Sequence, residues 1–445
     1  MADNSSPHSL VVPEETVLDA CGTQKLPRMG TIEQVWHTNP IAPEQIERHA
    51  SEMVTTLELT TVEPGDEVAV GVGSRGIGNL PAIVRGVVSG LRNAGYEPFV
   101  FPAMGSHGGA TADGQVSKLE ALGVKEDSIG CEVRSTMETV VVGHTSERNV
   151  PVHADAAAAA ADGIIPVNRV KPHTDFQGSV ESGLAKMLVI GMGNQVGAKT
   201  AHEWAVDWSF RQMIPEIASF MLDALPILGG VAIVEDQRDE TAVIEGVPAN
   251  TLLERESALL ERAYDLLPSL PFDDLDVLVV DQMGKDVSGA GMDTNVVGRR
   301  PYAINEPEPE SPSVKRIYVR SLTDASHGNA SGLGMADFIH QRLAGSADPL
   351  KLLINTLTSS SPRAARTPPV VETDRAGLTA ALSTVGVVEP DEARILRISD
   401  TMQLDRLYAS EALVREARER DDLLVDGDLR EIEFSSGELT APSPS

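Results

Sequence analysis

Hydrophobic and polar positions change their period several times along the chain, and these changes predict alternating strands and helices. An apolar run over 68–72 is followed by a Gly/Ser turn and then by apolar residues at helical spacing: Leu80, Ile83, Val84, Val87, Val88 and Leu91. Gly95 ends that helix, and a second apolar run follows over 97–103. The glycine-rich turn 104–111 then opens another helix. This order is typical of a parallel sheet covered by helices.

Further apolar runs extend this pattern through the rest of the chain. We predict strands over 137–143, 163–168, 229–236, 276–282, 314–322 and 393–401, and helices over 207–225 and 251–267. A turn-rich segment, 267–276, separates two groups of elements. A chain of 445 residues is also longer than a single hydrophobic core usually serves. We therefore predict an α/β fold of two α/β domains with mainly parallel sheets and an active-site cleft between them. The expected ranges are 1–270 for an N-terminal cofactor-binding domain, 271–432 for a C-terminal domain, and 433–445 for a disordered tail.

The charge balance limits the partners of the protein. With 66 acidic and 36 basic residues, the formal net charge is −30, which repels nucleic-acid phosphates and anionic lipid. Only nine of the basic residues are lysines, which fits either a high-salt cytoplasm or a GC-rich genome. An anionic substrate would need a local positive site inside this acidic surface, so clustered basic residues are informative.

Cysteine use and the N-terminal segment indicate a cytoplasmic protein. Cys21 and Cys131 are too few for a disulfide framework or a four-thiolate iron–sulfur cluster. The N-terminus lacks the basic and apolar regions of a signal peptide, and no apolar stretch is long enough to span a membrane. We expect neither a nucleic-acid nor a membrane partner, and a homo-oligomer is compatible with this composition.

The loop after the strand at 97–103 holds a histidine among residues that suit ligand binding. Gly105, Ser106 and Gly108 flank His107 and would let backbone N–H groups approach a ligand, beside the positive end of a helix dipole. An imidazole there can exchange a proton near pH 7. The alternative is a histidine in a tight turn whose glycines only provide positive φ.

The segment 167–204 gathers two imidazoles and an amine. Pro172 fixes the backbone before His173, and burial of Lys186 in its apolar run would make it a nucleophilic amine. His202 could ligate a metal that brings its other donors with it. The alternatives are a surface histidine, a lysine that reaches solvent from a helix, and a histidine on a helix surface.

Two further loops offer groups for an anionic substrate. Arg75 follows the first apolar run, and its guanidinium can bind a carboxylate through two hydrogen bonds or can serve as a structural ion-pair partner. Its loop does not match a dinucleotide-binding fingerprint. The glycine-rich stretch after the strand at 276–282 offers Lys285, Asp293 and Asn295, with Arg299 shortly after, either as substrate contacts or as part of a structural connection.

The order of these features resembles the nickel-dependent lactate racemase family over roughly residues 60–205, and more loosely elsewhere. Members of that family use a nickel-pincer nucleotide (nickel pyridinium-3,5-bisthiocarboxylic acid mononucleotide). The resemblance implies that Lys186 is the cofactor lysine and that His202 ligates nickel. It also implies His107 and His173 as the acid/base pair and Arg75 as the substrate anchor. The residues expected around the cofactor are Gly105, Ser106, Gly108 and Gly178.

The activity implied by the resemblance is racemisation or epimerisation of a 2-hydroxy acid by hydride transfer to and from the cofactor, with one histidine base for each enantiomer. Val72 and Gly73 replace the acidic residue expected before the Arg75 loop, and Val297, Gly298 and Arg299 or Arg300 stand where lactate racemases have Tyr, Gln and Lys. These departures favour a small anionic 2-hydroxy acid other than lactate. A hydride-shuttling oxidoreductase with the same cofactor and a non-catalytic cofactor-binding protein are the alternatives.

Overall fold

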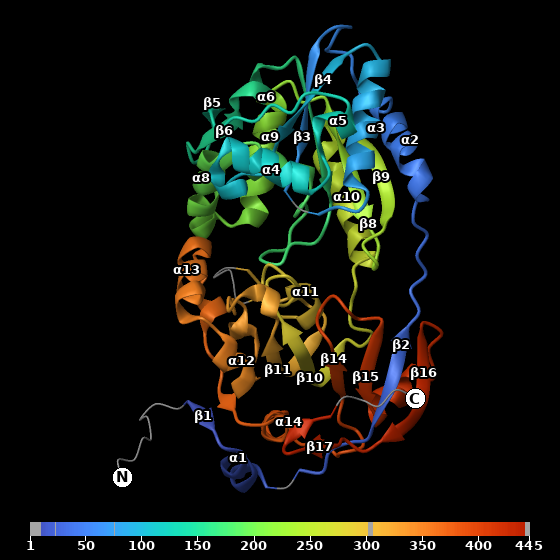
Figure 1. The fold of residues 1–445 in the computed structure, drawn as a ribbon, viewed down its shortest axis with the longest axis vertical. Coiled ribbons are helices and arrows are strands. Elements are labelled where there is room, and N and C mark those ends of the chain that lie inside the picture. Colours follow the sequence, from blue (N-terminus) through green and yellow to red (C-terminus); the bar gives the residue numbers. More distant parts are fainter. Residues whose placement is uncertain (1–9, 23, 75, 301–305, 441–445) are drawn as a thin grey trace. The chain divides into compact units, whose positions relative to one another are not determined.

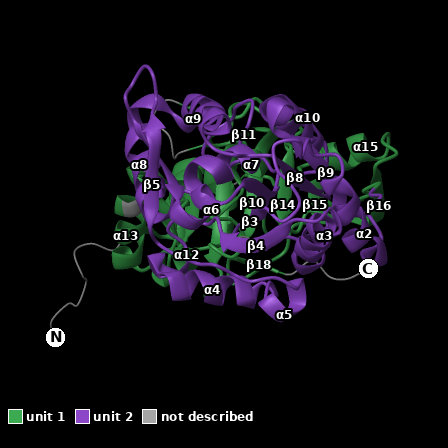
Figure 2. Cartoon of the chain, turned by 90° about the horizontal axis from the view of Figure 1, so that it is seen from above, with its two compact units in different colours: residues 1–37, 268–445 green, residues 38–267 purple. Residues whose placement is uncertain are grey.

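The chain folds into two compact units, each built around its own β-sheet (Figure 1). A computed structural model describes residues 10–22, 24–74, 76–300 and 306–440. Unit 1 consists of Met1–His37 and Pro268–Ser445, and unit 2 is the continuous segment Thr38–Leu267 (Figure 2). The predicted α/β class with mainly parallel sheets is confirmed. The cleft expected between the two domains stays a prediction.

Unit 2 contains a five-stranded sheet in the order β4-β3-β7-β8-β9. Its strands are β3 (Glu67–Val72), β4 (Glu97–Pro102), β7 (Gly163–Arg169), β8 (Gly229–Glu235) and β9 (Thr241–Pro248). The first four are parallel to their neighbours, whereas β9 is antiparallel to β8. The predicted strands at 68–72, 97–103, 163–168 and 229–236 are all present in this sheet.

Helices cover both faces of this sheet because its strands are apolar on both sides. Val68 and Val70 of β3 pack into one core with α2 (Pro43–Val54) and α3 (Leu80–Asn93), and Ala69 packs into the other core. That second core includes η2 (Met187–Gly191), α9 (Phe210–Ala224) and α10 (Leu252–Asp265). The remaining helices of unit 2 are η1 (Gly108–Ala110), α4 (Ala112–Ala121), α5 (Glu126–Ile129), α6 (Ala156–Ala160), α7 (Leu184–Lys186), α8 (Asn194–Trp208) and η3 (Ala249–Thr251).

One predicted strand lies outside the main sheet of unit 2. The run at 137–143 forms β5 (Thr139–His144), which pairs only with β6 (Pro151–Asp155) in an antiparallel hairpin. Val140 and Val141 of β5 are exposed, so this strand is not part of a two-sided core.

Unit 1 contains a nine-stranded sheet in the order β1-β13-β12-β11-β10-β14-β15-β2-β16. The strands are β1 (Val11–Val12), β2 (Met29–Gln34), β10 (Asp274–Met283), β11 (Ser313–Leu322), β12 (Phe338–His340), β13 (Val370–Val371), β14 (Ile395–Ile398), β15 (Arg406–Ser410) and β16 (Leu423–Arg430). The first six strands in this order (β1, β13, β12, β11, β10 and β14) pair with one another in parallel. The last three strands, β15, β2 and β16, pair in antiparallel orientation at the end of the sheet beyond β14.

Helices also cover both faces of the unit 1 sheet. One core contains α1 (Glu14–Cys21) and α14 (Asp374–Leu382), and the other contains α12 (Gln341–Ser346) and α15 (Glu411–Ala417). The remaining helices are α11 (Thr294–Val297), η4 (Asp324–Ser326), η5 (Leu333–Met335), α13 (Pro349–Ser359) and η6 (Pro362–Ala365). No helix among the described residues is apolar over a length that would cross a membrane.

The two ends of the chain differ from the predicted domain ranges. Residues expected in the N-terminal domain supply β2, which pairs with β15 and β16, so this part of the chain belongs to unit 1. Within the expected disordered tail, β17 (Phe434–Ser435) and β18 (Glu438–Leu439) form a hairpin that packs on α14. Residues 441–445 lie outside the described part of the chain. The junction between the two units lies between Leu267 and Pro268.

Candidate functional site

The carboxyl ends of three neighbouring strands in unit 2 carry the residues of the candidate site. Ser74 follows β3, His107 follows β4, and His173 follows β7. Because β4, β3 and β7 are adjacent and parallel, their three loops leave the sheet at the same edge. This is the edge at which open α/β sheets bind ligands.

His173 is fixed through its ring and lies against Lys186. The N–H group of Asp175 donates a hydrogen bond to Nδ1 of His173 at 3.0 Å, and the Phe176 ring stacks on the imidazole at a centroid distance of 4.6 Å. Nε2 of the same ring is in hydrogen-bonding contact with Nζ of Lys186. The structure thus brings together an imidazole and an amine from different elements.

Lys186 lies where an α-helical turn widens into a π-helix. It ends α7, and η2 continues from Met187 as a π-helix before α8 begins. Lys186 is half-buried, whereas its neighbours Ala185 and Met187 are buried. Single π-helical turns of this kind occur frequently at functional sites, because they change the direction of side chains within a helix.

A buried carboxylate, that of Glu256, supports the turn that carries Lys186. Glu256 has no exposed surface, and its Oε2 accepts a hydrogen bond from the N–H group of Ala185 at 2.9 Å. Gly183 makes this approach possible, since a Cβ atom there would lie 2.2 Å from Oε1. Burial raises the pKa of Glu256 to about 7, against the opposing effect of hydrogen bonds from Ala185 and Leu184.

His202 presents an imidazole on α8 near Lys186. His202 is exposed, and its ring meets the Phe210 ring edge-on at a centroid distance of 5.2 Å. Surrounding protein atoms and the charge of Lys186 lower the pKa of His202, while Asp175 opposes this shift. No hydrogen bond reaches its ring nitrogens from residues 10–22, 24–74, 76–300 or 306–440. A neutral imidazole of this kind is a suitable metal ligand.

His107 lies in a loop that packs against the π-helix. Nδ1 of its exposed ring is in hydrogen-bonding contact with Oγ of the buried Ser74. Gly105 has a φ of +61°, and its N–H group donates to the carbonyl of Gly191 at 2.9 Å. A Cβ atom at Gly105 would lie 3.1 Å from the carbonyl oxygen of Ile190. The His107 loop therefore contacts the element that continues from Lys186.

Two of the four residues predicted to contact a cofactor have clear roles within the protein. Gly108 has a φ of +68°, and a Cβ atom there would lie 2.6 Å from the backbone of Gly114 at the start of α4. The N–H group of Gly178 donates to Oε1 of Glu181 at 3.1 Å. Ser106 is exposed beside His107. Arg75, the predicted substrate anchor, lies outside the described residues.

The other predicted substrate contacts belong to unit 1, where the structure gives each a partner within that unit. Arg299 pairs with Asp337 at 2.7 Å and donates to three backbone carbonyls. Asp293 caps α11, and Asn295 accepts a hydrogen bond from Arg300 at 2.8 Å. Nζ of Lys285 donates to the carbonyl of Gly289. In this structure, Arg299 in particular fastens a loop to β11 and its surroundings.

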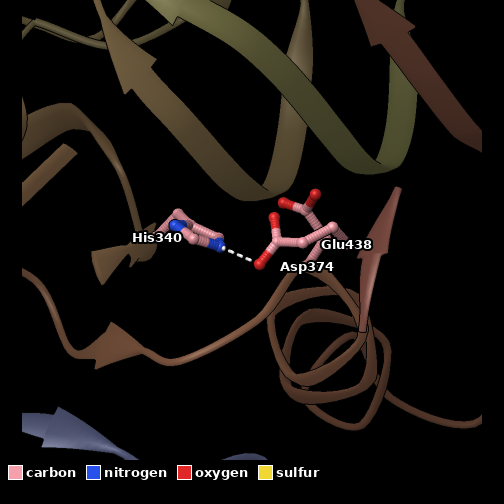
Figure 3. A group of neighbouring side chains, drawn as sticks. All are labelled: His340, Asp374 and Glu438. Atoms are coloured by element: carbon pink, nitrogen blue, oxygen red, sulfur yellow. Dashed lines mark hydrogen bonds and ion pairs between the residues drawn. The ribbon is translucent and has the colours of Figure 1, made fainter. Parts of the chain in front are cut away.

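A second group of polar side chains, His340, Asp374 and Glu438, lies in unit 1 (Figure 3). Their potential ligand atoms all lie within 4.8 Å of one another. However, Arg320 pairs with Asp374 at 2.6 Å, and Arg342 pairs with Glu438 at 2.6 Å, so two guanidinium groups already neutralise the carboxylates. Nδ1 of His340 accepts the N–H group of Arg342, which directs the ring proton on Nε2 toward Glu438. This arrangement indicates an ion-pair network rather than a metal site.

The network fastens the C-terminal hairpin to α14. Asp374 accepts the N–H group of Leu439 at 2.8 Å, and the carbonyl of Gly437 accepts the N–H group of Arg375 at 2.9 Å. Burial opposes ionisation of Asp374, but the hydrogen bonds and charge of Arg320 prevail and lower the pKa of Asp374 to about 2. The carboxylate is therefore ionised at all ordinary pH values.

A pocket of about 150 Å³ lies in unit 1 under the same hairpin. Its walls include Arg397, Tyr408, Leu378, Ile395 and Leu439. None of its lining residues is a predicted site residue, and several acidic side chains surround it. It is not the site at which the chemistry of His107, His173 and Lys186 would take place.

Several residues of the site were not identified from the sequence. Ser74 and Glu181 lie in polar loops with no distinguishing pattern. Glu256 could have been identified from the sequence, because it is a charged residue among the apolar positions of a helical stripe. The buried residues of that helix are Leu252, Glu256, Leu259, Leu260 and Ala263. A charged residue in such a stripe indicates a buried carboxylate with a specific partner.

Comparisons with known proteins give distant structural likenesses. No family model matches the sequence, and no curated protein matches it. The lactate racemase apoprotein from Thermoanaerobacterium thermosaccharolyticum is similar over 84% of this chain and 89% of its own, at 10% identity and a TM-score of 0.44. A protein from Thermotoga maritima solved by a structural genomics consortium is similar over 64% of this chain and 72% of its own, at 15% identity and a TM-score of 0.44. Neither likeness says what this chain does.

Proposed function

We propose that this chain is a racemase or epimerase of a small anionic 2-hydroxy acid and that it uses a nickel-pincer nucleotide. The observation that carries the proposal is the grouping of His173, Lys186 and His202 in unit 2, with the His107 loop packed against the same π-helix. These residues are two candidate proton-transfer groups, a half-buried amine and a single imidazole ligand. That set suits a cofactor which supplies most of its own metal donors.

The residues present fit such a cofactor. Metal binding requires a neutral imidazole, and the lowered pKa of His202 provides one. Its ring nitrogens have no hydrogen-bond partner within the described ranges. Lys186 would hold the nucleotide, covalently or by close contact, and His202 would complete the coordination of nickel.

The chain's own groups provide the acid/base chemistry. When bound, the cofactor would supply an acceptor for the hydride on C2 of the substrate. In both histidines Nδ1 is engaged by the protein, with Asp175 in one case and Ser74 in the other. We propose that the two imidazoles exchange a proton with the substrate hydroxyl, with one histidine serving each enantiomer. Arg75 is the proposed partner of the substrate carboxylate.

The test is turnover of single enantiomers by protein purified from cells that make the pincer nucleotide. Enantiopure 2-hydroxy acids, including dicarboxylic and polyhydroxy members, would be incubated with the enzyme and separated by chiral chromatography. The proposal predicts that one of them yields its opposite enantiomer or its epimer. Net conversion to a 2-keto acid would favour the oxidoreductase alternative. A nickel-loaded protein that turns over none of them would favour the cofactor-binding alternative.

A further inference from the structure

The carboxylate of Glu181 lies buried behind His173. Glu181 has no exposed surface. Its Oε2 accepts the N–H group of His173 at 2.6 Å, and its Oε1 accepts the N–H group of Gly178 at 3.1 Å and the hydroxyl of Tyr264 at 2.9 Å. A buried carboxylate is costly unless it is hydrogen-bonded, so the loop and α10 together must hold these donors in place.

The loop that carries His173 is closed at its base and filled by this carboxylate. Lys171 and Ser182 exchange two backbone hydrogen bonds, at 2.8 and 3.1 Å, which join the two ends of the loop. Glu181 then reaches into the loop and binds the backbone at both His173 and Gly178. Because Tyr264 belongs to α10, the carboxylate also anchors the loop to a helix of the unit 2 core.

The contact between His173 and Lys186 depends on where this loop holds the imidazole. The ring receives a hydrogen bond from Asp175 and stacks on Phe176, both within the loop that Glu181 closes. Lys186 approaches from a separate element, α7. A shift of the loop would therefore move the ring relative to the amine, even if all contacts inside the loop were kept.

We propose that Glu181, anchored by Tyr264, is the positioning residue of His173. It sets the loop so that Nδ1 is held by Asp175 and Nε2 lies against Nζ of Lys186. The importance of this role for turnover rests on the proposed function, in which His173 is an acid/base group. The positioning itself does not depend on a substrate or a cofactor, so it is measurable on the protein alone.

The carboxylate has no good substitute in this position. An amide has only one accepting oxygen, and its NH₂ group would face an N–H donor. Glu181→Gln therefore loses at least one backbone hydrogen bond and gains a repulsive contact. Tyr264→Phe removes the hydrogen bond from its hydroxyl and leaves both backbone contacts, so its effect should be smaller and in the same direction.

Unit 2 contains a matched control in Asp155. This buried carboxylate also accepts two backbone N–H groups, from Ala157 and Ala158, and one side-chain donor, from Asn194. It caps α6, and none of its hydrogen bonds within the described residues goes to the His173 loop. Asp155→Asn should destabilise unit 2 without changing the environment of His173.

The experiment is ¹⁵N NMR of the full-length protein labelled at its histidine side chains. Ring ¹⁵N shifts report which nitrogen carries the proton, and His173→Ala identifies the signals of His173 among the ten histidines. In the wild type, the His173 ring should show a single tautomer with Nδ1 unprotonated. Glu181→Gln should shift these signals toward an average of both tautomers, Tyr264→Phe should shift them less, and Asp155→Asn should leave them unchanged.

Two results would overturn the proposal. One is unchanged His173 ring signals in both Glu181→Gln and Tyr264→Phe. The other is an equal change in Asp155→Asn, which would show a general loss of stability. If Glu181→Gln does not fold, the proposal is still tested by comparing the His173 ring signals of Tyr264→Phe with those of Asp155→Asn. A protein that binds no nickel could still pass this test, so failure of the proposed function and failure of this inference are distinguishable.

Discussion

Two imidazoles, those of His107 and His173, carry the proton transfers of the proposed reaction. Replacing either by alanine should lower turnover by about 10²- to 10⁴-fold, because general acid–base catalysis contributes about that much. Neither residue is the proposed metal ligand, so both variants should keep their nickel. Chiral turnover and nickel content, measured on the same samples, check this prediction. Full activity in either variant would contradict the two-base mechanism.

His202 should behave in the opposite way. His202→Ala removes the only proposed protein ligand of nickel, so nickel should be lost or fall far below one per chain. His144→Ala is a matched control, since His144 is an exposed histidine on the β5 hairpin of the same unit. Elemental analysis of both variants tests the assignment. Full nickel occupancy in His202→Ala would remove His202 from the site.

The sequence singled out candidate residues with distinctive chemistry, but not the residues that contact them in the structure. His107, His173 and Lys186 were singled out because clustered basic residues are informative in an acidic chain, and their predicted roles came from the family resemblance. The contacts of Ser74 with His107, and of Glu181 with His173, depend on loops from distant parts of the sequence meeting in space. Such contacts have no local pattern. Conversely, Arg299 looked available for substrate but is paired with Asp337 in the structure.

Glu256, in α10, makes the stability of the Lys186 turn depend on pH. Its pKa is raised from 4.5 to about 7, so between these values the folded protein binds a proton that the unfolded chain has released. Stability contributed by this group is therefore present below pH 4.5 and lost as pH rises through 7, by about 3 kcal/mol at most. Glu256→Gln keeps an oxygen for Ala185 but cannot ionise.

The prediction is a smaller fall in unfolding free energy between pH 5 and pH 8 for Glu256→Gln than for the wild type. Urea unfolding followed by circular dichroism at both pH values measures the two differences, and contributions from other groups cancel in the comparison. Identical pH dependence in the two proteins would mean that Glu256 ionises normally in the folded state.

The hairpin β17–β18 should depend on the buried pair of Arg320 and Asp374. Arg320→Leu leaves the fully buried Asp374 carboxylate without its guanidinium, which should cost about 3–5 kcal/mol. Arg28→Leu, which breaks the more exposed pair with Glu411 in the same unit, should cost much less than Arg320→Leu. Urea unfolding compares the two variants. Equal losses of unfolding free energy in the two variants would mean that burial does not make the Arg320–Asp374 pair more important for stability.

Local periodicity predicted the elements well where both faces of a strand are buried. The runs at 68–72, 163–168 and 229–236 are apolar because helices cover both sides of the unit 2 sheet. The run at 137–143 looked alike but forms an exposed hairpin, since periodicity does not say which partner a strand finds. Strand β2 was missed because its polar residues and antiparallel neighbours give it no continuous apolar run.

Each unit has its own hydrophobic cores, which predicts that unit 2 folds alone. A fragment of residues 38–267 should unfold cooperatively and remain monomeric, because it is continuous and keeps both cores on its sheet. A fragment of residues 1–270 adds β2 without its partners β15 and β16, and the unpaired strand should promote aggregation. Size-exclusion chromatography and circular dichroism compare the two. A fragment 38–267 that is unfolded would contradict the independence of unit 2.

The proposal that the protein holds a nickel-pincer nucleotide at Lys186 is most directly tested by nickel content and intact mass, measured on the whole chain purified from cells that make the nucleotide. We predict near-stoichiometric nickel and an added mass that disappears in Lys186→Ala. Nickel without added mass would mean that the cofactor is bound non-covalently. Absence of both nickel and adduct would contradict the account, and His107, His173 and Lys186 would then form the site of some other reaction or ligand.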